Sequence, residues 1–333
     1  MEKLPIVGIT IGDVVGIGPE VVAKALVHPK IYEVCRPLVI GDARVFGDPK
    51  FAAPIPNLAI IEDPEKAGRS PDTVHLLDLH NLAPDEVEMG QISQAAGRAA
   101  VAYVLKATEL AIAGDIDAIA TAPLNKEAMR MAGYHYIGHT EILAELTGAR
   151  RSTTMLATPG LRVTHVTRHI PFREIADQIT TANILDTISI TYEGMRDLGF
   201  ARPRIAVAAL NPHGGEGGLL GREEIDEITP AVEAARERGI DAHGPIPADS
   251  VFFQTILGNY DVVVTMYHDQ GHVAVKTHGF EQSITITLGL PIVRTSADHG
   301  TAFDIAGRGI ATEDSMLAAI TEAGRIATRR RAA

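Results

Sequence analysis

The stretch Ile6-Val7-Gly8-Ile9-Thr10-Ile11 is followed by a glycine loop, by a helical pattern at residues 19–27 and by a second apolar run at residues 37–40. Short β-branched runs that alternate with helical patterns predict strands joined by crossover helices. Strands joined in this way pair in parallel, so the stretch predicts a parallel or mostly parallel sheet covered by helices. We therefore assign the chain to the α/β class.

The same alternation continues to residue 295. The predicted helix at 91–113 stops at Gly114, and the predicted helix at 223–238 stops at Gly239, because glycine readily adopts the left-handed conformation just after a helix. The remaining expected elements are strands at 117–120, 154–157, 161–166, 204–210, 261–266 and 292–295, helices at 141–146 and 184–198, and a last helix that closes with residues 329–331.

Length and composition limit the possible classes of protein. A chain of 333 residues favours two domains, or one large α/β unit with a cleft. The formal net charge of -12 comes without a basic stripe, so nucleic acid is not an expected partner. A single cysteine, Cys35, and an N-terminal segment without an apolar core favour the cytoplasm. No apolar run reaches the roughly 18 residues of a spanning helix, so no membrane location is expected.

The glycine loop, residues 12–20, lies between the first predicted strand and a helix that we expect to have Pro19 in its first turn. Glycines allow close backbone approach, and helix N-termini attract anions. The spacing matches neither the dinucleotide fingerprint nor the P-loop. Alone, such a loop is more often structural.

Three histidines, His169, His213 and His268, each follow a predicted strand. A single histidine in such a place is more often an ordinary hydrogen-bonded residue. Three imidazoles with an open position, however, suit a divalent metal that polarises a substrate oxygen. The repeated strand-end context favours a metal site.

Phosphate binding requires backbone donors and cations, and the sequence offers both. Ordinary surface charge explains each of these residues equally well when it is taken alone. A glycine-rich polar loop at 298–309 has the composition to wrap the adenine end of a nucleotide. The candidate anion binders and their neighbouring carboxylates are His139, Thr140, Lys276, Arg294, Asp249 and Asp269.

Together these features resemble the 4-hydroxythreonine-4-phosphate dehydrogenase (PdxA) family and, more distantly, isocitrate and isopropylmalate dehydrogenases. The resemblance extends in order from Gly12 to Gly309. It rests on Leu210-Asn211-Pro212-His213 with Gly215-Glu216-Gly217-Gly218, on Met266-Tyr267-His268-Asp269-Gln270-Gly271, and on Leu288-Gly289-Leu290-Pro291 with Arg294-Thr295-Ser296 and Asp298-His299-Gly300-Thr301-Ala302.

The resemblance implies a two-domain α/β/α sandwich with its active site in the interdomain cleft. Residues 1–130 and about 300–333 would form the first domain. Residues 131–299 would form the second, with the metal ligands and the interface of a homodimer whose two subunits share each active site.

The resemblance also implies a role for each candidate residue. It implies metal ligation by His169, His213 and His268, and substrate binding by His139, Thr140, Lys276, Thr285 and Arg294. It implies NAD or NADP binding by Gly12, Asp13, Gly16, His299, Gly300, Thr301 and Asp304. Lys276, Asp249 and Asp269 are the candidate catalytic groups, and Lys276 serves equally well as a phosphate cation.

The implied reaction is the NAD(P)- and metal-dependent oxidation and decarboxylation of 4-hydroxythreonine 4-phosphate, which yields 3-amino-2-oxopropyl phosphate and CO2 in pyridoxine biosynthesis. The chain departs from the family pattern in its Asp13-Val14-Val15-Gly16 segment, in Asn125, in Thr285, which replaces an asparagine, and in His272, which replaces an apolar residue. D-threonate or D-erythronate 4-phosphate, which would give dihydroxyacetone phosphate and CO2, is therefore an alternative substrate. The metal (zinc, magnesium, manganese or cobalt) stays open.

Two rival classes of protein stay open. The four-residue spacing of His268 and His272 resembles a helical zinc motif of metallohydrolases, but the glutamate of that motif is missing and residues 262–266 are predicted as a strand. A catalytically silent binding protein is the second rival. The retained histidines, Lys276 and Arg294 weigh against it.

Overall fold

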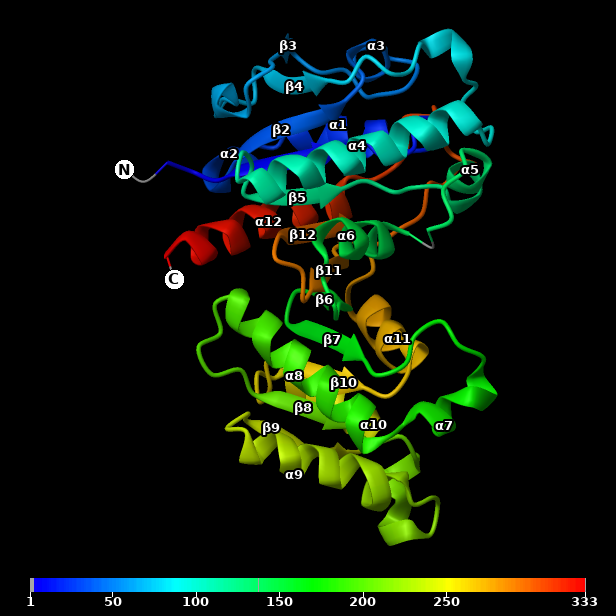
Figure 1. Cartoon of the computed structure of the whole chain (residues 1–333), viewed down its shortest axis with the longest axis vertical. Coiled ribbons are helices and arrows are strands. Elements are labelled where there is room, and N and C mark those ends of the chain that lie inside the picture. Colours follow the sequence, from blue (N-terminus) through cyan, green and yellow to red (C-terminus); the bar gives the residue numbers. More distant parts are fainter. Residues whose placement is uncertain (1–2, 137, 333) are drawn as a thin grey trace. The chain divides into compact units, whose positions relative to one another are not determined.

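The structure is a computed structural model that describes residues 3–136 and 138–332, so Met1 and Glu2 of the N-terminal segment lie outside it (Figure 1). The chain separates into a first unit, Met1–Arg150 with Leu290–Ala333, and a second unit, Arg151–Gly289. The sequence analysis placed these boundaries near residues 130 and 299. In the structure, the first unit extends to Arg150 and resumes at Leu290. It includes α6 (His139–Thr147), which packs on α4 (Gln94–Ala113), and β12 (Val293–Ala297), which pairs with β5 (Ala118–Thr121).

The first unit contains a parallel sheet in the order β3-β4-β2-β1-β5-β12. Its inner strands are buried along their whole length, as expected where helices cover both faces. The other elements of this unit are β1 (Ile6–Thr10), α1 (Gly18–Leu26), α2 (Pro29–Val34), β2 (Arg36–Gly41), α3 (Ala43–Phe46), β3 (Leu58–Ile60), η1 (Pro64–Lys66), β4 (Val74–Asp78), η2 (Pro84–Glu86), α5 (Lys126–Met131) and α12 (Asp314–Ala332).

The second unit contains a mixed sheet in the order β11-β6-β7-β10-β8-β9. β6 runs antiparallel to both neighbours, and the remaining pairs are parallel. The elements are β6 (Thr153–Thr158), β7 (Leu161–His165), η3 (Phe172–Glu174), α7 (Ile175–Gln178), α8 (Thr181–Asp197), β8 (Ile205–Ala208), η4 (Pro212–Gly218), η5 (Glu224–Ile228), α9 (Thr229–Glu237), β9 (Ala242–Ile246), α10 (Ala248–Ile256), β10 (Val262–Thr265), α11 (His268–Gly279) and β11 (Ile284–Leu288).

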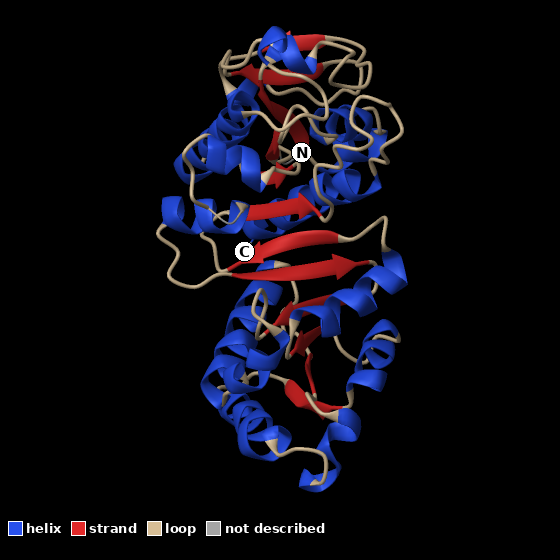
Figure 2. Cartoon of the chain, turned by 90° about the vertical axis from the view of Figure 1, so that its right-hand side faces the viewer, coloured by secondary structure: helices blue, strands red, loops and turns tan. Residues whose placement is uncertain are grey.

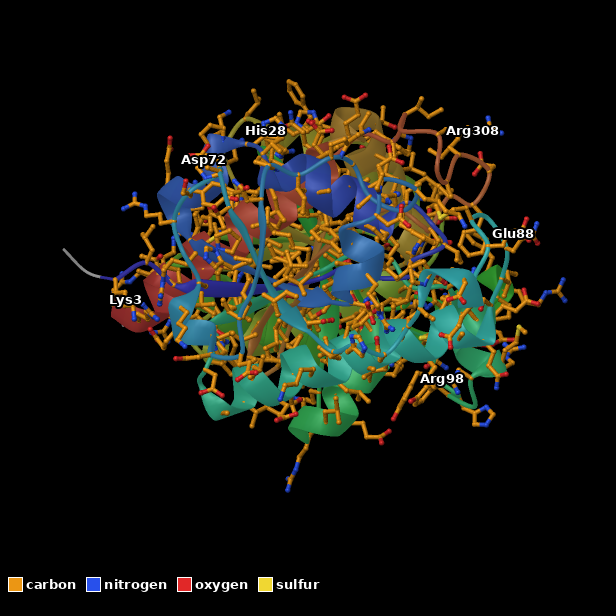
Figure 3. The ribbon with its side chains drawn as sticks, turned by 90° about the horizontal axis from the view of Figure 1, so that it is seen from above. Lys3, His28, Asp72, Glu88, Arg98 and Arg308 are labelled. Atoms are coloured by element: carbon orange, nitrogen blue, oxygen red, sulfur yellow. The ribbon has the colours of Figure 1, made fainter. Side chains whose placement is uncertain are left out.

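Each unit is therefore a sheet with helices packed against it, and Figure 2 shows the helices flanking the strands. The core of the second unit gathers apolar side chains from four strands and from α10 and α11. Charged side chains such as those of Lys3, Glu88, Arg98 and Arg308 project at the rim of the first unit (Figure 3). The predicted α/β class is confirmed.

Local signals located most elements correctly. Pro19 lies in the first turn of α1, and Gly114 and Gly239 have positive φ angles of 81° and 78° just after their helices. The largest omission is α11, which the sequence analysis did not predict. His268 and His272 therefore do lie on a helix, although the glutamate of the zinc motif is still absent. Among the described residues, no helix is long and apolar enough to cross a membrane.

Candidate active site

The second unit brings four histidine rings together at one edge of its sheet. β7, β10 and β8 are parallel neighbours, so their carboxyl ends meet at one edge, where ligands bind in α/β sheets. His165 ends β7, and α11 begins just after β10 with His268. The ring centroid of His268 lies 3.6 Å from that of His272, 5.7 Å from that of His169 and 5.9 Å from that of His165.

Two residues of the polar motif at the start of α11, Gln270 and Gly271, have structural roles, and Figure 1 shows the position of this helix. The Gln270 side chain accepts a hydrogen bond from the Met266 amide (2.7 Å) and donates one to the Ala209 carbonyl (2.8 Å), which ties the helix start to β10 and β8. Gly271 leaves room for His165, because a Cβ at this position would lie 2.5 Å from Cε1 of that ring. The motif therefore packs the first turn of α11 directly against β7.

The hydrogen bond of His268 suits a metal ligand. Its Nδ1 lies 2.6 Å from Oδ1 of Asp269, and a carboxylate can only accept, so Nδ1 carries a proton and Nε2 is the ring nitrogen that a metal would bind. A carboxylate behind a histidine is the usual arrangement at metal sites. Among the residues that the structure describes, no group of three or more His, Cys, Asp or Glu side chains is arranged to hold a metal ion. The predicted ligand set, with its partner subunit, stays a prediction.

His213 is presented by an unusual backbone. His213, Gly214, Gly215, Glu216 and Gly217 all have left-handed conformations, with φ between 48° and 78°. Glu224 anchors the preceding residues, since its carboxylate accepts hydrogen bonds from the amides of Leu210 (2.9 Å) and Asn211 (2.7 Å). His213 is exposed, and no ring contact links it to His169 or His268 among the described side chains.

The other predicted residues of the second unit lie on three elements. Lys276 is further along α11, half-buried, with its ammonium group 5.1 Å from the ring centroid of Phe280. Thr285 lies on β11 opposite Leu156. Asp249 is exposed in the first turn of α10, and Asp269 is exposed beside His268. α11 thus carries both a predicted metal ligand and the predicted catalytic lysine.

In the first unit, Arg294 forms a buried cationic centre. Its guanidinium Nε and Nη2 donate to Oγ1 of Thr121 at 3.2 and 2.7 Å. Burial lowers the pKa of Arg294 to about 9, so the group is still charged at neutral pH. A buried cation favours anionic neighbours and ligands, and the charge of Glu141 supplies part of this compensation. The chemistry of this position therefore fits the predicted phosphate contact.

His139 begins α6 near Arg294, and Thr140 follows it in the first turn. Burial, reinforced by the charge of Arg294, holds the pKa of His139 well below its usual value, so the ring is neutral. The ring donates to the carbonyl of Ala122, while Nε2 is buried without a partner. A neutral imidazole with a bare Nε2 accepts a hydrogen bond. His139 therefore suits a hydroxyl or a protonated phosphate oxygen.

The two predicted nucleotide loops touch within the first unit. The amide of Ile17 donates to the carbonyl of Thr301 at 3.0 Å. A Cβ on Gly16 would lie 2.7 Å from that same carbonyl oxygen, so the loops can approach only because residue 16 is glycine. The loop at 298–309 is also fastened from behind, because Lys24 donates to the carbonyls of Gly309 (2.9 Å) and Ala311 (2.6 Å).

Some polar atoms in these loops are available for a ligand. Oδ2 of Asp13 and Nε2 of His299 are buried without a partner, and burial raises the pKa of Asp13 to about 6. Gly300 is exposed and has no atom near the place where a Cβ would lie, and Asp304 is exposed. Unpartnered polar atoms beside an open glycine fit the predicted nucleotide site.

Sequence reasoning missed several residues that shape these sites. These residues are buried or half-buried. The partners of Glu224 lie 13 and 14 residues away, and partners of the others come from distant parts of the chain: His165, Thr121, Thr265 and Lys24. One signal was present for His165, because it lies at the end of a predicted strand, as His169 and His268 lie just after theirs. The same signal was present for Thr121 and Thr265, which lie at or just after the ends of predicted strands, whereas Lys24 and Glu224 show no local signal.

A family model described as the pyridoxal phosphate biosynthetic protein PdxA matches residues 33–323 of the chain. The chain belongs to the PdxA family. It is 48% identical to D-threonate 4-phosphate dehydrogenase of Cupriavidus necator, over 99% of both chains. A crystal structure of 4-hydroxythreonine-4-phosphate dehydrogenase from Klebsiella pneumoniae matches with a TM-score of 0.89 and 43% identity, over 97% of this chain and 99% of that one. A crystal structure of 4-hydroxythreonine-4-phosphate dehydrogenase from Burkholderia phymatum matches with a TM-score of 0.85 and 46% identity, over 98% of this chain and 99% of that one.

These matches confirm the predicted family, α/β fold and dehydrogenase class. PdxA-family relatives carry both of the names that the sequence analysis considered. A dehydrogenase of this family oxidises a CH–OH group, so the matches favour this interpretation over the metallohydrolase and the silent binding protein.

Proposed function

We propose that the protein oxidises and decarboxylates D-threonate 4-phosphate or its epimer D-erythronate 4-phosphate. The observation that carries this proposal is the 48% identity, over 99% of both chains, to a relative named D-threonate 4-phosphate dehydrogenase. Thr285 in place of the family's asparagine supports a changed substrate. The second candidate is 4-hydroxythreonine 4-phosphate, which the similarity to the Klebsiella enzyme favours.

The reaction balances with NAD or NADP as the oxidant. The substrate hydroxyl loses its proton to a base and its carbon loses a hydride to the nicotinamide. The resulting β-keto acid loses CO2 by cleavage of its bond to the carboxylate, and one proton returns to the carbon that is left. The products are dihydroxyacetone phosphate, CO2 and the reduced nucleotide.

Residues of the first unit would bind substrate and nucleotide. Arg294, with Thr140 at the start of α6, would hold the phosphoryl group through charge-assisted hydrogen bonds. His139 would accept a substrate hydroxyl proton in a hydrogen bond through Nε2, the atom that the structure leaves without a partner. The touching loops around Gly16 and Thr301 would hold NAD or NADP, together with Gly12, Asp13, His299, Gly300 and Asp304.

Residues of the second unit would hold the cation and move the proton. His169, His213 and His268 would be the ligands of a zinc, magnesium, manganese or cobalt ion. Such an ion, when bound, supplies a Lewis acid that polarises a substrate oxygen. Lys276, or a water molecule near Asp249, would carry the proton, and Lys276 serves equally well as a phosphate cation. Asp269 would keep the proton of His268 on Nδ1.

We further propose a homodimer in the cytoplasm. The second unit exposes large apolar side chains, including Leu219 (84% exposed) and Phe253 (63% exposed), as protein interfaces do. The single cysteine of the chain, Cys35, lies in the first unit and is buried and free, which suits a reducing compartment. Sedimentation of the purified protein at monomer mass, at every concentration tested, would contradict the dimer.

The decisive experiment is a spectrophotometric assay of nucleotide reduction. D-threonate, D-erythronate and 4-hydroxythreonine 4-phosphates are each tested with NAD or NADP and each of the four metals. We expect the highest kcat/KM with a sugar-acid phosphate. Thr285→Asn should move the preference toward the amino acid phosphate, while Thr285→Ser, the matched control, should not. A wild-type enzyme that prefers 4-hydroxythreonine 4-phosphate would establish the second candidate instead.

A further inference from the structure

Two histidines near His268 have no role in the proposed reaction. His165 is buried at the end of β7, and His272 lies one turn beyond His268 on α11. The centroid of the His272 ring is 3.6 Å from that of His268, with an interplanar angle of 12°, and 4.8 Å from that of His165, with an angle of 28°. We call His165, His268 and His272 the imidazole cluster.

The hydrogen bonds fix the tautomer of His165. The single hydroxyl proton of Thr265 is donated to the Thr164 carbonyl at 2.9 Å, so its oxygen must accept from Nδ1 of His165, 2.7 Å away. Nε2 of His165 is buried without a partner.

The other two rings have the same tautomer. Nδ1 of His272 lies 3.1 Å from the carbonyl oxygen of His268, and a carbonyl can only accept, so this nitrogen carries the proton. Nδ1 of His268 donates to Asp269, as described above. All three rings of the imidazole cluster are thus held by their Nδ1 protons. The arrangement leaves Nε2 of His268 as the atom that can bind a cation.

The carboxylate of Asp269 cannot fix the plane of the His268 ring by itself. The Asp269 side chain is 78% exposed, so water competes for its oxygens and it can rotate. The face of His268, in contrast, lies flat against His272. His272 in turn rests against His165, which Thr265 holds from one side and α11 approaches at Gly271. The rigid part of this arrangement is therefore the pair of histidines that the reaction does not use.

We propose that His165 and His272 are positioning residues that fix the plane of the His268 ring, and so aim its Nε2 lone pair at the divalent cation. This inference rests on the proposed function, in which His268 is a metal ligand. It assigns no metal bond to either residue. Partners behind a metal ligand typically change metal affinity or activity by about 10- to 100-fold when they are removed.

The test measures cobalt binding by the full chain, by calorimetry and from the visible spectrum of bound Co²⁺. We expect His272→Ala to weaken binding about 10- to 100-fold and to shift the spectrum. His272→Phe keeps a flat ring against His268 and should restore most of the lost affinity. His243→Ala is the matched control, because His243 is a half-exposed histidine of the same unit that is paired with Asp241. It should bind cobalt as the wild type does.

A second variant tests the base of the cluster without altering a histidine. Gly271→Ala forces a Cβ against His165, so the ring must shift. We expect weaker cobalt binding and a shifted spectrum in a chain that still unfolds cooperatively. Unchanged cobalt binding in Gly271→Ala would overturn the positioning role of His165, and unchanged binding in His272→Ala would overturn that of His272.

The outcomes separate this inference from the proposed function. If His268→Ala binds cobalt as the wild type does, the metal assignment itself is wrong. If His268→Ala loses cobalt while His272→Ala keeps it, only the positioning role fails. If His272→Phe is as weak as His272→Ala, the flat ring face is not what matters, and the positioning role fails as well.

Discussion

In the first unit the candidate site contains a buried cation, Arg294, whereas in the second unit it contains a buried imidazole, His165. Arg294 has only donors, so an anion is the ligand that compensates its burial. The imidazole cluster offers lone pairs, so a cation is the ligand that it suits. Two α/β units built by the same rules thus offer opposite chemistries, one suited to an anion and the other suited to a cation.

The strand arrangement explains why these groups gather. Thr121 ends β5 in the first unit, and His165 and Thr265 end the parallel strands β7 and β10 in the second. Side chains at the carboxyl ends of parallel strands are free to face a ligand. The choice of side chain at these ends, rather than the fold, therefore separates the anion chemistry of one unit from the cation chemistry of the other.

Removal of the buried cation should have the largest effect. Arg294→Ala loses two charge-assisted hydrogen bonds, each worth about 1.5–3 kcal/mol, so the KM for the phosphorylated substrate should rise at least about 100-fold. Arg294→Lys keeps the positive charge but loses the paired donors of the guanidinium, so its KM should lie between those of the wild type and Arg294→Ala. The measurement is steady-state kinetics, with thermal unfolding to verify the fold. The exposed Arg222→Ala is the control, and an unchanged KM in Arg294→Ala would remove the phosphate assignment.

The second prediction concerns Asp13, a buried carboxyl of the first unit. Burial raises its pKa from 3.8 to about 6. Between these values the folded chain keeps the proton that the unfolded chain loses, so the stability that this residue contributes is present below pH 4 and is lost as pH rises through 6. The difference of about two pKa units corresponds to about 3 kcal/mol.

Asp13→Asn, which cannot ionise, should therefore raise the free energy of unfolding by up to about 3 kcal/mol at pH 8 and change it little at pH 4. Urea unfolding at both pH values measures the effect, with the exposed Asp85→Asn as the control. A gain of equal size at both pH values would show that ionisation of Asp13 is not the cause.

The elements that were located correctly and those that were missed show which features the sequence can predict. β1, α1 and the glycine ends of α4 and α9 follow from patterns within a few residues, and all were located correctly. α11 was missed because its polar, glycine-containing sequence has little helical periodicity, and the contacts of Gln270 with β10 and β8 hold its start in place. His165 was missed for a similar reason, since its partners Thr265 and His272 are about 100 residues away in sequence.

The smallest expected effect tests the strained turn that presents His213. Glu216 is exposed and has a φ of 48°, a conformation that costs a non-glycine residue about 1 kcal/mol. Glu216→Gly should therefore raise the free energy of unfolding by about 0.5–1 kcal/mol, whereas Glu216→Ala should not. Gly217→Ala is the reverse experiment, because its φ is 65° and a Cβ there would meet nothing within 4 Å, so any loss comes from the backbone alone. Chemical unfolding of the three variants measures both effects. If Glu216→Gly is no more stable than Glu216→Ala, the turn is relaxed in solution, and Glu224 holds His213 in place without opposing strain.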